Sequence, residues 1–248
     1  MPRIGTRKLH YMLTETLQKH SISIGRNKLF DLLAEYGLLV RRRKRKRVNT
    51  TDSNHPFRKY PNLIRELQVL RPNHLWVSDI TYISLVECFC YLSLVTDAYS
   101  RKIVGYCLYP TLKKEGPLQA LQMALGTLPG KPETTLIHHS DRGLQYCCEG
   151  YITHLENNAV LISMTEKGDP YENAIAERVN GILKEEFALD KDFDSFEQAK
   201  IAVENAISIY NQLRPHASCN YLTPDQAHQQ QGLLPSKWKR KKEVANVA

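Results

Sequence analysis

The chain has 248 residues, of which 42% are hydrophobic, and it carries a formal net charge of +8. This length allows one or two domains with cores of their own. No apolar run approaches the roughly 18 to 20 residues that a membrane-spanning helix needs, and the N-terminus lacks the apolar segment of an export signal. We therefore expect a cytoplasmic protein with no membrane partner.

The positive charge is concentrated at the N-terminal end. Residues 1–47 contain 13 Lys or Arg and three acidic residues, a net charge of +10, which leaves residues 48–248 at −2. A basic segment joined to a nearly neutral body is typical of a protein that binds a polyanion through one part and carries its chemistry in another.

Residues 1–40 are predicted to form a small helical domain. Leucine and methionine recur at helical spacing over residues 7–19 and 25–36, and Gly37 is a natural stop signal. The short turn between the two stretches gives the pair the size of a helix-turn-helix DNA-binding element. An ordinary helical hairpin fits the pattern equally well.

A run of seven basic residues follows, in a predicted linker at residues 41–60. The run repels itself and packs poorly, so it is either a solvated tether or an arm that binds phosphates. We favour the phosphate-binding arm because the run continues a basic hairpin. The DNA-contacting residues predicted here are Arg41, Arg42, Arg43, Lys44, Arg45, Lys46 and Arg47. A second basic cluster lies in the predicted C-terminal tail, residues 229–248.

Residues 61–228 are predicted to form one α/β core. Three consecutive strands are expected first, at residues 75–83, 88–96 and 103–109. Helices and strands then alternate, with helices at 117–125, 149–157, 170–187 and 196–213 and strands at 135–139 and 160–164. This order predicts a mixed five-stranded sheet flanked by helices.

Two aspartates lie where a carboxylate is unusual. Asp79 interrupts an apolar strand, and aspartate is depleted both in strands and in protein cores. Asp141 follows the strand at 135–139, at the sheet edge where α/β folds place their ligands. Taken singly, Asp79 could pair with an arginine and Asp141 could cap a turn.

The third acidic residue, Glu177, is expected on a long helix with one polar stripe. Spacings of three and four residues bring Asn173, Glu177, Asn180 and Lys184 to the same face. A solvated helix surface would produce the same stripe and is the commoner case. The turn GDPYEN before the helix favours an active site, because it would direct the stripe to one end of the sheet.

Three carboxylates that converge would suit a hard divalent cation such as Mg²⁺, which prefers oxygen ligands and substrate phosphates. Two such ions, about 3.5 to 4 Å apart, can activate an attacking hydroxyl and stabilise the leaving oxygen in phosphoryl transfer. Lys184, further along the polar stripe, is placed to bind a substrate phosphate. The pattern therefore predicts metal-dependent chemistry on a phosphodiester.

Four ordered segments carry a family resemblance: HLWVSDITYI, HHSDRGLQY, KGDPYENAIAERVNGILKEE and YNQLRPHASCNYLTPDQA. Together with the 35 residues between Asp141 and Glu177, they resemble the catalytic subunit of bacterial insertion-sequence transposases of insertion-sequence family three. That subunit is similar to the retroviral integrase core. The resemblance covers about residues 5–227.

The resemblance implies an RNase H-like fold with a DDE triad of Asp79, Asp141 and Glu177. The triad would bind two Mg²⁺ or Mn²⁺ ions and catalyse DNA cleavage and strand transfer. It also implies that Asn173 and Lys184 contact DNA near the site.

The resemblance further implies the partners. Two DNA ends must be joined to a target, so a homo-oligomer is expected, acting on the bacterial nucleoid. The upstream reading frame of such elements supplies a helix-turn-helix and an oligomerising helix, so we expect a fused or separate partner.

Two alternatives stay open. An RNase H-like nuclease would share the fold but hydrolyse nucleic acid. A domesticated, catalytically silent protein would only bind DNA through residues 1–47. The presence of all three acidic residues favours an active enzyme.

Overall fold

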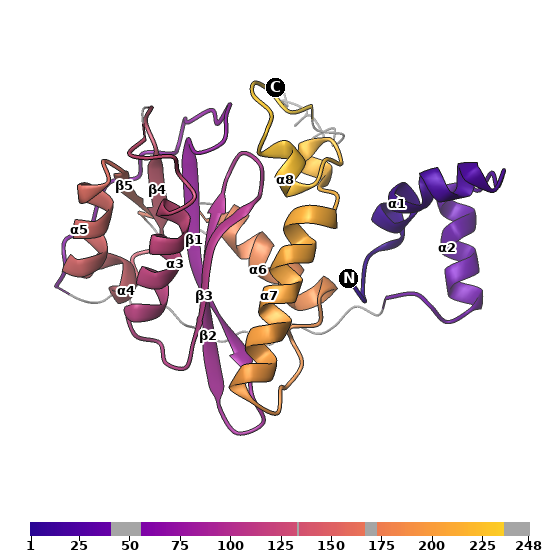
Figure 1. Cartoon of the computed structure of the whole chain (residues 1–248), viewed down its shortest axis with the longest axis horizontal. Coiled ribbons are helices and arrows are strands. Elements are labelled where there is room, and N and C mark those ends of the chain that lie inside the picture. The colour runs from indigo at the N-terminus through magenta and orange to yellow at the C-terminus, as the bar shows by residue number, and fades with distance from the viewer. Residues whose placement is uncertain (41–55, 133, 167–172, 236–248) are drawn as a thin grey trace, which may run out of the picture.

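A computed structural model describes residues 1–40, 56–132, 134–166 and 173–235 of the chain. Figure 1 shows an α/β core with a small helical hairpin at one side of it. The predicted phosphate-binding arm at residues 41–47 lies outside the described residues, as does the basic cluster of the C-terminal tail. Within the described ranges, no helix is long and apolar enough to cross a bilayer.

The N-terminal hairpin, residues 1–40, contains the two predicted helices. Helix α1 spans Thr6–Lys19 and α2 spans Arg26–Glu35, and Gly37 follows α2 with a φ of 67°. Glycine adopts this left-handed conformation without the steric penalty of a Cβ. Within residues 1–40, Leu29 is the one buried side chain of the two helices. The hairpin therefore has almost no core of its own.

The described residues of the core form a mixed five-stranded sheet in the order β3-β2-β1-β4-β5. The strands are β1 (Leu75–Ser84), β2 (Phe89–Asp97), β3 (Ile103–Tyr109), β4 (Ile137–Ser140) and β5 (Leu161–Met164). The first three form an antiparallel meander, whereas β4 runs parallel to β1 and β5 runs parallel to β4. The predicted sheet is confirmed, and β1 lies at its centre beside β4.

Helices flank both faces of this sheet, as predicted. In the described part of the core they are α3 (Glu115–Leu125), α4 (Leu144–Cys147), α5 (Glu149–Asn157), α6 (Ala174–Glu186), α7 (Phe196–Leu213) and α8 (Pro224–Ala227), with a 3-10 turn at Ala217–Cys219. The short helices α4 and α8 were not predicted, because four residues are too few to show a helical period. The predicted helix at 170–187 is described from α6 onwards.

Each face of the sheet has its own hydrophobic core. Helices α3 and α5 cover one face, where Trp76, Leu121 and Leu155 are fully buried. Helices α6 and α7 cover the other face, where Leu92 and Tyr210 are fully buried. The alternation of side chains along each strand supplies both cores at once.

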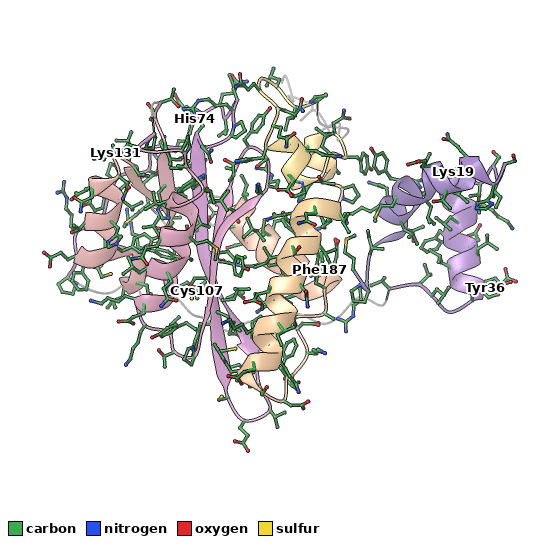
Figure 2. The ribbon with its side chains drawn as sticks, viewed as in Figure 1. Lys19, Tyr36, His74, Cys107, Lys131 and Phe187 are labelled. Atoms are coloured by element: carbon green, nitrogen blue, oxygen red, sulfur yellow. The ribbon has the colours of Figure 1, made fainter. Side chains whose placement is uncertain are left out.

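Helix α3 packs very closely on β3. A Cβ at Gly105 would lie 2.1 Å from the backbone oxygen of Ala120, a separation that no side chain tolerates. Glycine at this position therefore sets the distance between helix and sheet. Figure 2 shows Cys107, two residues further along β3, on the α3 side of the sheet and Phe187 on the α7 side.

A buried ion pair joins the ends of α6 and α7. Arg214, whose side chain is 1% exposed, donates from Nε and Nη2 to the two carboxylate oxygens of Glu186 at 2.8 and 2.9 Å. Such two-pronged pairing is the strongest form of arginine–carboxylate contact. Burial raises the pKa of Glu186, but the hydrogen bonds and positive charges of Arg214 and Lys8 outweigh it and hold that pKa below its usual value.

The same ion pair attaches the N-terminal hairpin to the core. Lys8 of α1 donates from Nζ to Glu186 at 2.8 Å, and Arg3 pairs with Asp190 at 2.8 Å. The ring of Tyr11 stacks on that of Tyr221, with centroids 4.6 Å apart. At the far end of the hairpin, Tyr36 is exposed (Figure 2). The hairpin is thus docked through one end.

We expect Glu186→Gln to lower the free energy of unfolding at pH 7 by about 3 to 5 kcal/mol, because it leaves the buried Arg214 charge without its partner. The pKa of Glu186 is lower in the folded state, so its stabilisation is present above the unfolded pKa of about 4.3 and is lost as pH falls through the folded pKa. Urea denaturation at pH 7 and below pH 4 should show the difference shrinking with acid. Glu185→Gln, at an exposed neighbour, is the control, and equal losses in both variants would contradict the role of the pair.

Candidate active site

Asp79 lies in the middle of β1, on the face that α6 covers. Its Oδ2 accepts a hydrogen bond from Asn180 Nδ2 at 2.8 Å, and its Oδ1 accepts one from the backbone N–H of Ile80 at 2.9 Å. Burial raises the pKa of Asp79 to about 7, aided by the negative charges of Asp141 and Glu177 and opposed by the two hydrogen bonds. A carboxylate with this environment is typical of a functional site.

Asp141 follows the last residue of β4, at the carboxyl edge of the sheet. Its Oδ1 accepts the backbone N–H of Gly143 at 2.9 Å, so it also shapes the turn into α4. The turn-capping alternative is therefore correct for one carboxylate oxygen. A Cβ at Gly143 would come within 3.0 Å of that oxygen, which explains the glycine. Because β4 pairs with β1, the Asp141 charge acts on Asp79.

Glu177 lies in the first turn of α6, where its side chain is exposed. Its charge also raises the pKa of Asp79, although less than burial and Asp141 do. The three acidic residues thus come from β1, the end of β4 and the start of α6 to one region. Among the described residues, no group of three or more His, Cys, Asp or Glu side chains is close enough to form a ready metal site.

The polar stripe of α6 faces β1. Asn173, just before the helix, is buried and donates from Nδ2 to the backbone oxygen of Ser78 at 3.0 Å, and Asn180 bonds Asp79 as described. The ammonium group of Lys184 lies 3.7 Å from the centroid of the Tyr82 ring. The alternative of a solvated helix surface therefore does not hold for Asn173, Asn180 and Lys184, although Glu177 is exposed.

Lys184 is half-buried beside the carboxylates. Burial lowers its pKa to about 8, while the negative charges of Asp79 and Asp190 oppose that shift. The ammonium stays largely protonated at neutral pH and is held on an aromatic ring, an arrangement that stabilises a cation.

A polar network that sequence reasoning missed lies under β1. His138 Nε2 is 2.7 Å from Ser78 Oγ and 2.9 Å from Tyr151 Oη. Burial, with a smaller contribution from His139, lowers the pKa of His138 to about 3. The ring is therefore neutral. Because Ser78 precedes Asp79 and receives both this network and the Asn173 hydrogen bond, the strand is held immediately before the carboxylate.

Tyr146 of α4 completes the surroundings of the site. Its hydroxyl is buried and, within the described part of the chain, has no hydrogen-bond partner. Burial raises the pKa of Tyr146 well above its usual value, with contributions from Tyr151, Asp79 and Asp141. A neutral phenol thus lies beside two of the carboxylates. The position of Tyr146, five residues after Asp141, gave no indication in the sequence that its hydroxyl would lie here.

The chain matches two family models, both described as an integrase core domain, over residues 69–170 and residues 158–224. It is 36% identical over 222 residues to an uncharacterized 31 kDa protein of insertion element IS600 from Shigella sonnei, covering 89% of this chain and 79% of that protein. It is 30% identical over 213 residues to a putative transposase of insertion sequence IS986/IS6110 from Mycobacterium tuberculosis, covering 84% and 77%. Transposase InsF of insertion sequence IS3A from Escherichia coli is 37% identical over 156 residues, covering 62% and 54%.

Two solved structures share the fold. The HTLV-2 integrase catalytic core domain, in complex with magnesium and in a trimeric form, matches with a TM-score of 0.51 and 20% identity, covering 65% of this chain and 99% of that one. The intasome of simian T-cell lymphotropic virus matches with a TM-score of 0.55 and 19% identity, covering 96% and 79%. The core therefore has the RNase H-like fold, and the chain belongs to the family of bacterial insertion-sequence transposases with an integrase core domain.

Proposed function

We propose that Asp79, Asp141 and Glu177 are the catalytic carboxylates with which this DDE-type transposase cleaves DNA and transfers the cut strand. The observation that carries the proposal is the placement of Asp79 on β1, beside the strand β4 that ends at Asp141 and in hydrogen-bond contact with α6, the helix of Glu177. The three residues, with 61 and 35 residues between them in the sequence, come together near the carboxyl end of β4. The chain is a polynucleotidyl transferase by family, and the three carboxylates are the proposed site of that activity.

The three side chains fit a divalent cation by their chemistry. Carboxylate oxygens are the ligands that Mg²⁺ and Mn²⁺ prefer. A bound cation would also reduce the repulsion between Asp79 and the other two carboxylates. The exposed side chain of Glu177 is free of packing restraints that would prevent its approach. Two bound ions would activate an attacking hydroxyl and stabilise the leaving oxygen of a phosphodiester. Asp79, Asp141 and Glu177 would hold them.

The protein's own residues position these groups. Asn180 holds Oδ2 of Asp79, and Asn173 fixes the neighbouring carbonyl of β1. Asn173 was expected to contact DNA, but its buried amide instead suits a role in holding the strand. Lys184 keeps the expected role, because a protonated ammonium near Asp79 can bind a DNA phosphate.

The DNA-binding parts outside the site are proposed from charge. Residues 41–47 would bind phosphates between the N-terminal hairpin and the core, which is where a basic linker adds affinity. We propose that the protein acts on element ends and target DNA as a homo-oligomer on the bacterial nucleoid, because two ends must be joined. The HTLV-2 core was solved in a trimeric form. A product of the upstream reading frame is the proposed partner for end recognition.

We expect Glu177→Gln to reduce strand transfer by more than about 100-fold, because an amide is a poor ligand for a hard cation. Labelled duplex carrying the element end is incubated with Mg²⁺ and the upstream-frame product, and joined strands are counted on a gel. DNA binding should change by less than twofold. Glu185→Gln, an exposed glutamate on the same helix, should retain activity. A silent DNA-binding protein would show no transfer in the wild type, and a nuclease would release hydrolysed ends without joining them.

We expect Asn180→Leu to lower strand transfer by about 10- to 100-fold, because a hydrogen bond to a charged group contributes roughly 1.5 to 3 kcal/mol. Without the amide, Asp79 loses the donor that favours its ionised form, so the Mg²⁺ concentration for half-maximal activity should rise. Titration of activity with Mg²⁺ tests both effects. Unchanged metal dependence would show that Asn180 acts only in packing.

Addition of Mg²⁺ or Mn²⁺ should raise the melting temperature of the wild-type protein, because the cation offsets repulsion among the three carboxylates. Asp79→Asn removes one negative charge while keeping a carbonyl oxygen that Asn180 can still bond. This variant should melt at or above the wild-type temperature without metal and respond little to it. Thermal denaturation with and without EDTA measures both, and an equal metal response in the two proteins would contradict the assignment of the ligands.

A further inference from the structure

A row of aromatic side chains crosses the sheet beside the candidate site. Tyr82 of β1 pairs in register with Tyr91 of β2, which pairs with Tyr109 of β3. Directly opposed residues of antiparallel strands put their side chains on the same face. Phe89, two residues before Tyr91, shares this face, and its ring meets that of Tyr82 edge-on at 5.4 Å. We call these four residues the aromatic row.

The row lies where α3 begins, so the helix covers only part of it. A Cβ at Gly116, in the first turn of α3, would lie 3.1 Å from the Cβ of Tyr109. The three tyrosines are half-buried, and Phe89 is 50% exposed. A contiguous group of partly exposed aromatic side chains is a candidate binding surface.

The row and the Asp79 side chain lie on opposite faces of the sheet, and two contacts link the row to the candidate site. Lys184 places its ammonium on the ring of Tyr82, and this lysine also interacts with Asp79. At the other end, Gln145 of α4 donates from Nε2 to the backbone oxygen of Leu112 at 3.0 Å. That hydrogen bond joins the loop after Tyr109 to the segment that follows Asp141. Lys184 at one end and the loop after Tyr109 at the other thus connect the row to the surroundings of the carboxylates.

Positive charge lies at both ends of the row. Lys184 is next to Tyr82, and the exposed Lys113 and Lys114 follow Tyr109 in the loop before α3. Aromatic faces bordered by cations are the surface that single-stranded nucleic acid binds, with bases on the rings and phosphates on the cations. Paired bases inside a duplex have no free face to offer.

We propose that the aromatic row binds unpaired bases of the DNA strand that flank the phosphodiester held at the three carboxylates. The inference rests on the proposed function for the identity of the substrate. Phe89, Tyr91 and Tyr109 supply the stacking faces, because Lys184 already occupies one face of Tyr82. Lys113 and Lys114 bind the phosphates of the same strand.

Photocrosslinking of the wild-type protein tests the placement. A duplex with a single-stranded 5′ flank carries 5-iododeoxyuridine at one flank position at a time, without Mg²⁺, and crosslinked peptides are identified by mass spectrometry. We expect crosslinks in the peptides that contain Phe89, Tyr91 or Tyr109, and none when the iodinated base is paired in the duplex. Crosslinks confined to the N-terminal hairpin or the basic arm, or equal yields from paired bases, would overturn the proposal.

Affinity measurements test the energetics. Tyr91→Leu and Tyr109→Leu should each weaken binding of the flanked duplex by about fivefold or more, because stacking on one ring contributes roughly 1 to 3 kcal/mol per base. Tyr91→Phe and Tyr109→Phe keep the ring and should bind as the wild type does. All variants should bind blunt duplex equally. If the leucine variants are folded by circular dichroism and bind the flank with wild-type affinity, the row has no such role.

The salt dependence tests the lysines and separates this inference from the proposed function. Each of Lys113→Ala and Lys114→Ala should reduce the slope of log K against log salt by about 0.7 on the single-stranded flank. These experiments measure binding without metal. Their results therefore remain valid even if Glu177→Gln keeps its activity and the assignment of the catalytic residues is wrong. Loss of transfer in Glu177→Gln with no crosslink in the row would reject the row alone.

Discussion

The carboxylate of Asp79 in the central strand of the sheet is the constraint on which the rest of the site depends. A charged group in this position loses hydration, and two further carboxylates repel it. The hydrogen bonds from Asn180 and from the backbone of Ile80 offset only part of this penalty. The negative charge of the site is therefore not fully compensated by the protein alone. This is expected of a site that binds cations and a phosphodiester.

Helix α6 connects this site with the stability of the whole chain. Its first turn carries Glu177, its middle carries Asn180 and Lys184, and its last residue is Glu186. Because Glu186 is held by Arg214 and by Lys8 of the N-terminal hairpin, the helix cannot shift along its axis without breaking a buried ion pair. The docking of the hairpin and the geometry of the site are thus set by one element.

The two faces of strand β1 carry residues with different roles. On the α6 side it carries Asp79, and on the α3 side Ser78 bonds the buried His138. Further along, Tyr82 begins the aromatic row and supports Lys184. A strand fixed on both faces can hold a carboxylate in a defined place although its charge is unfavourable there.

The sequence by itself determined the elements with a long hydrophobic period. The predicted bounds of β3, α5 and α7 coincide with the observed ones. In each of these elements, hydrophobic residues recur with the strand or helix period over seven or more residues, because one face of the element is buried. The sequence also indicated the three acidic residues and the polar stripe of α6. It gave no sign of the four-residue helices α4 and α8, which show no period.

Only the tertiary structure decided what these residues face. The position of β4 beside β1 brings Asp141 to Asp79, and strand order depends on the packing of the whole sheet rather than on either segment. In the same way, the sequence placed Asn173 and Asn180 on one stripe of a helix. It could not show which residues their side chains contact. Their amides bond Ser78 and Asp79, about 100 positions earlier in the chain. Local pattern shows which side chains share a face, whereas long-range packing determines their contacts.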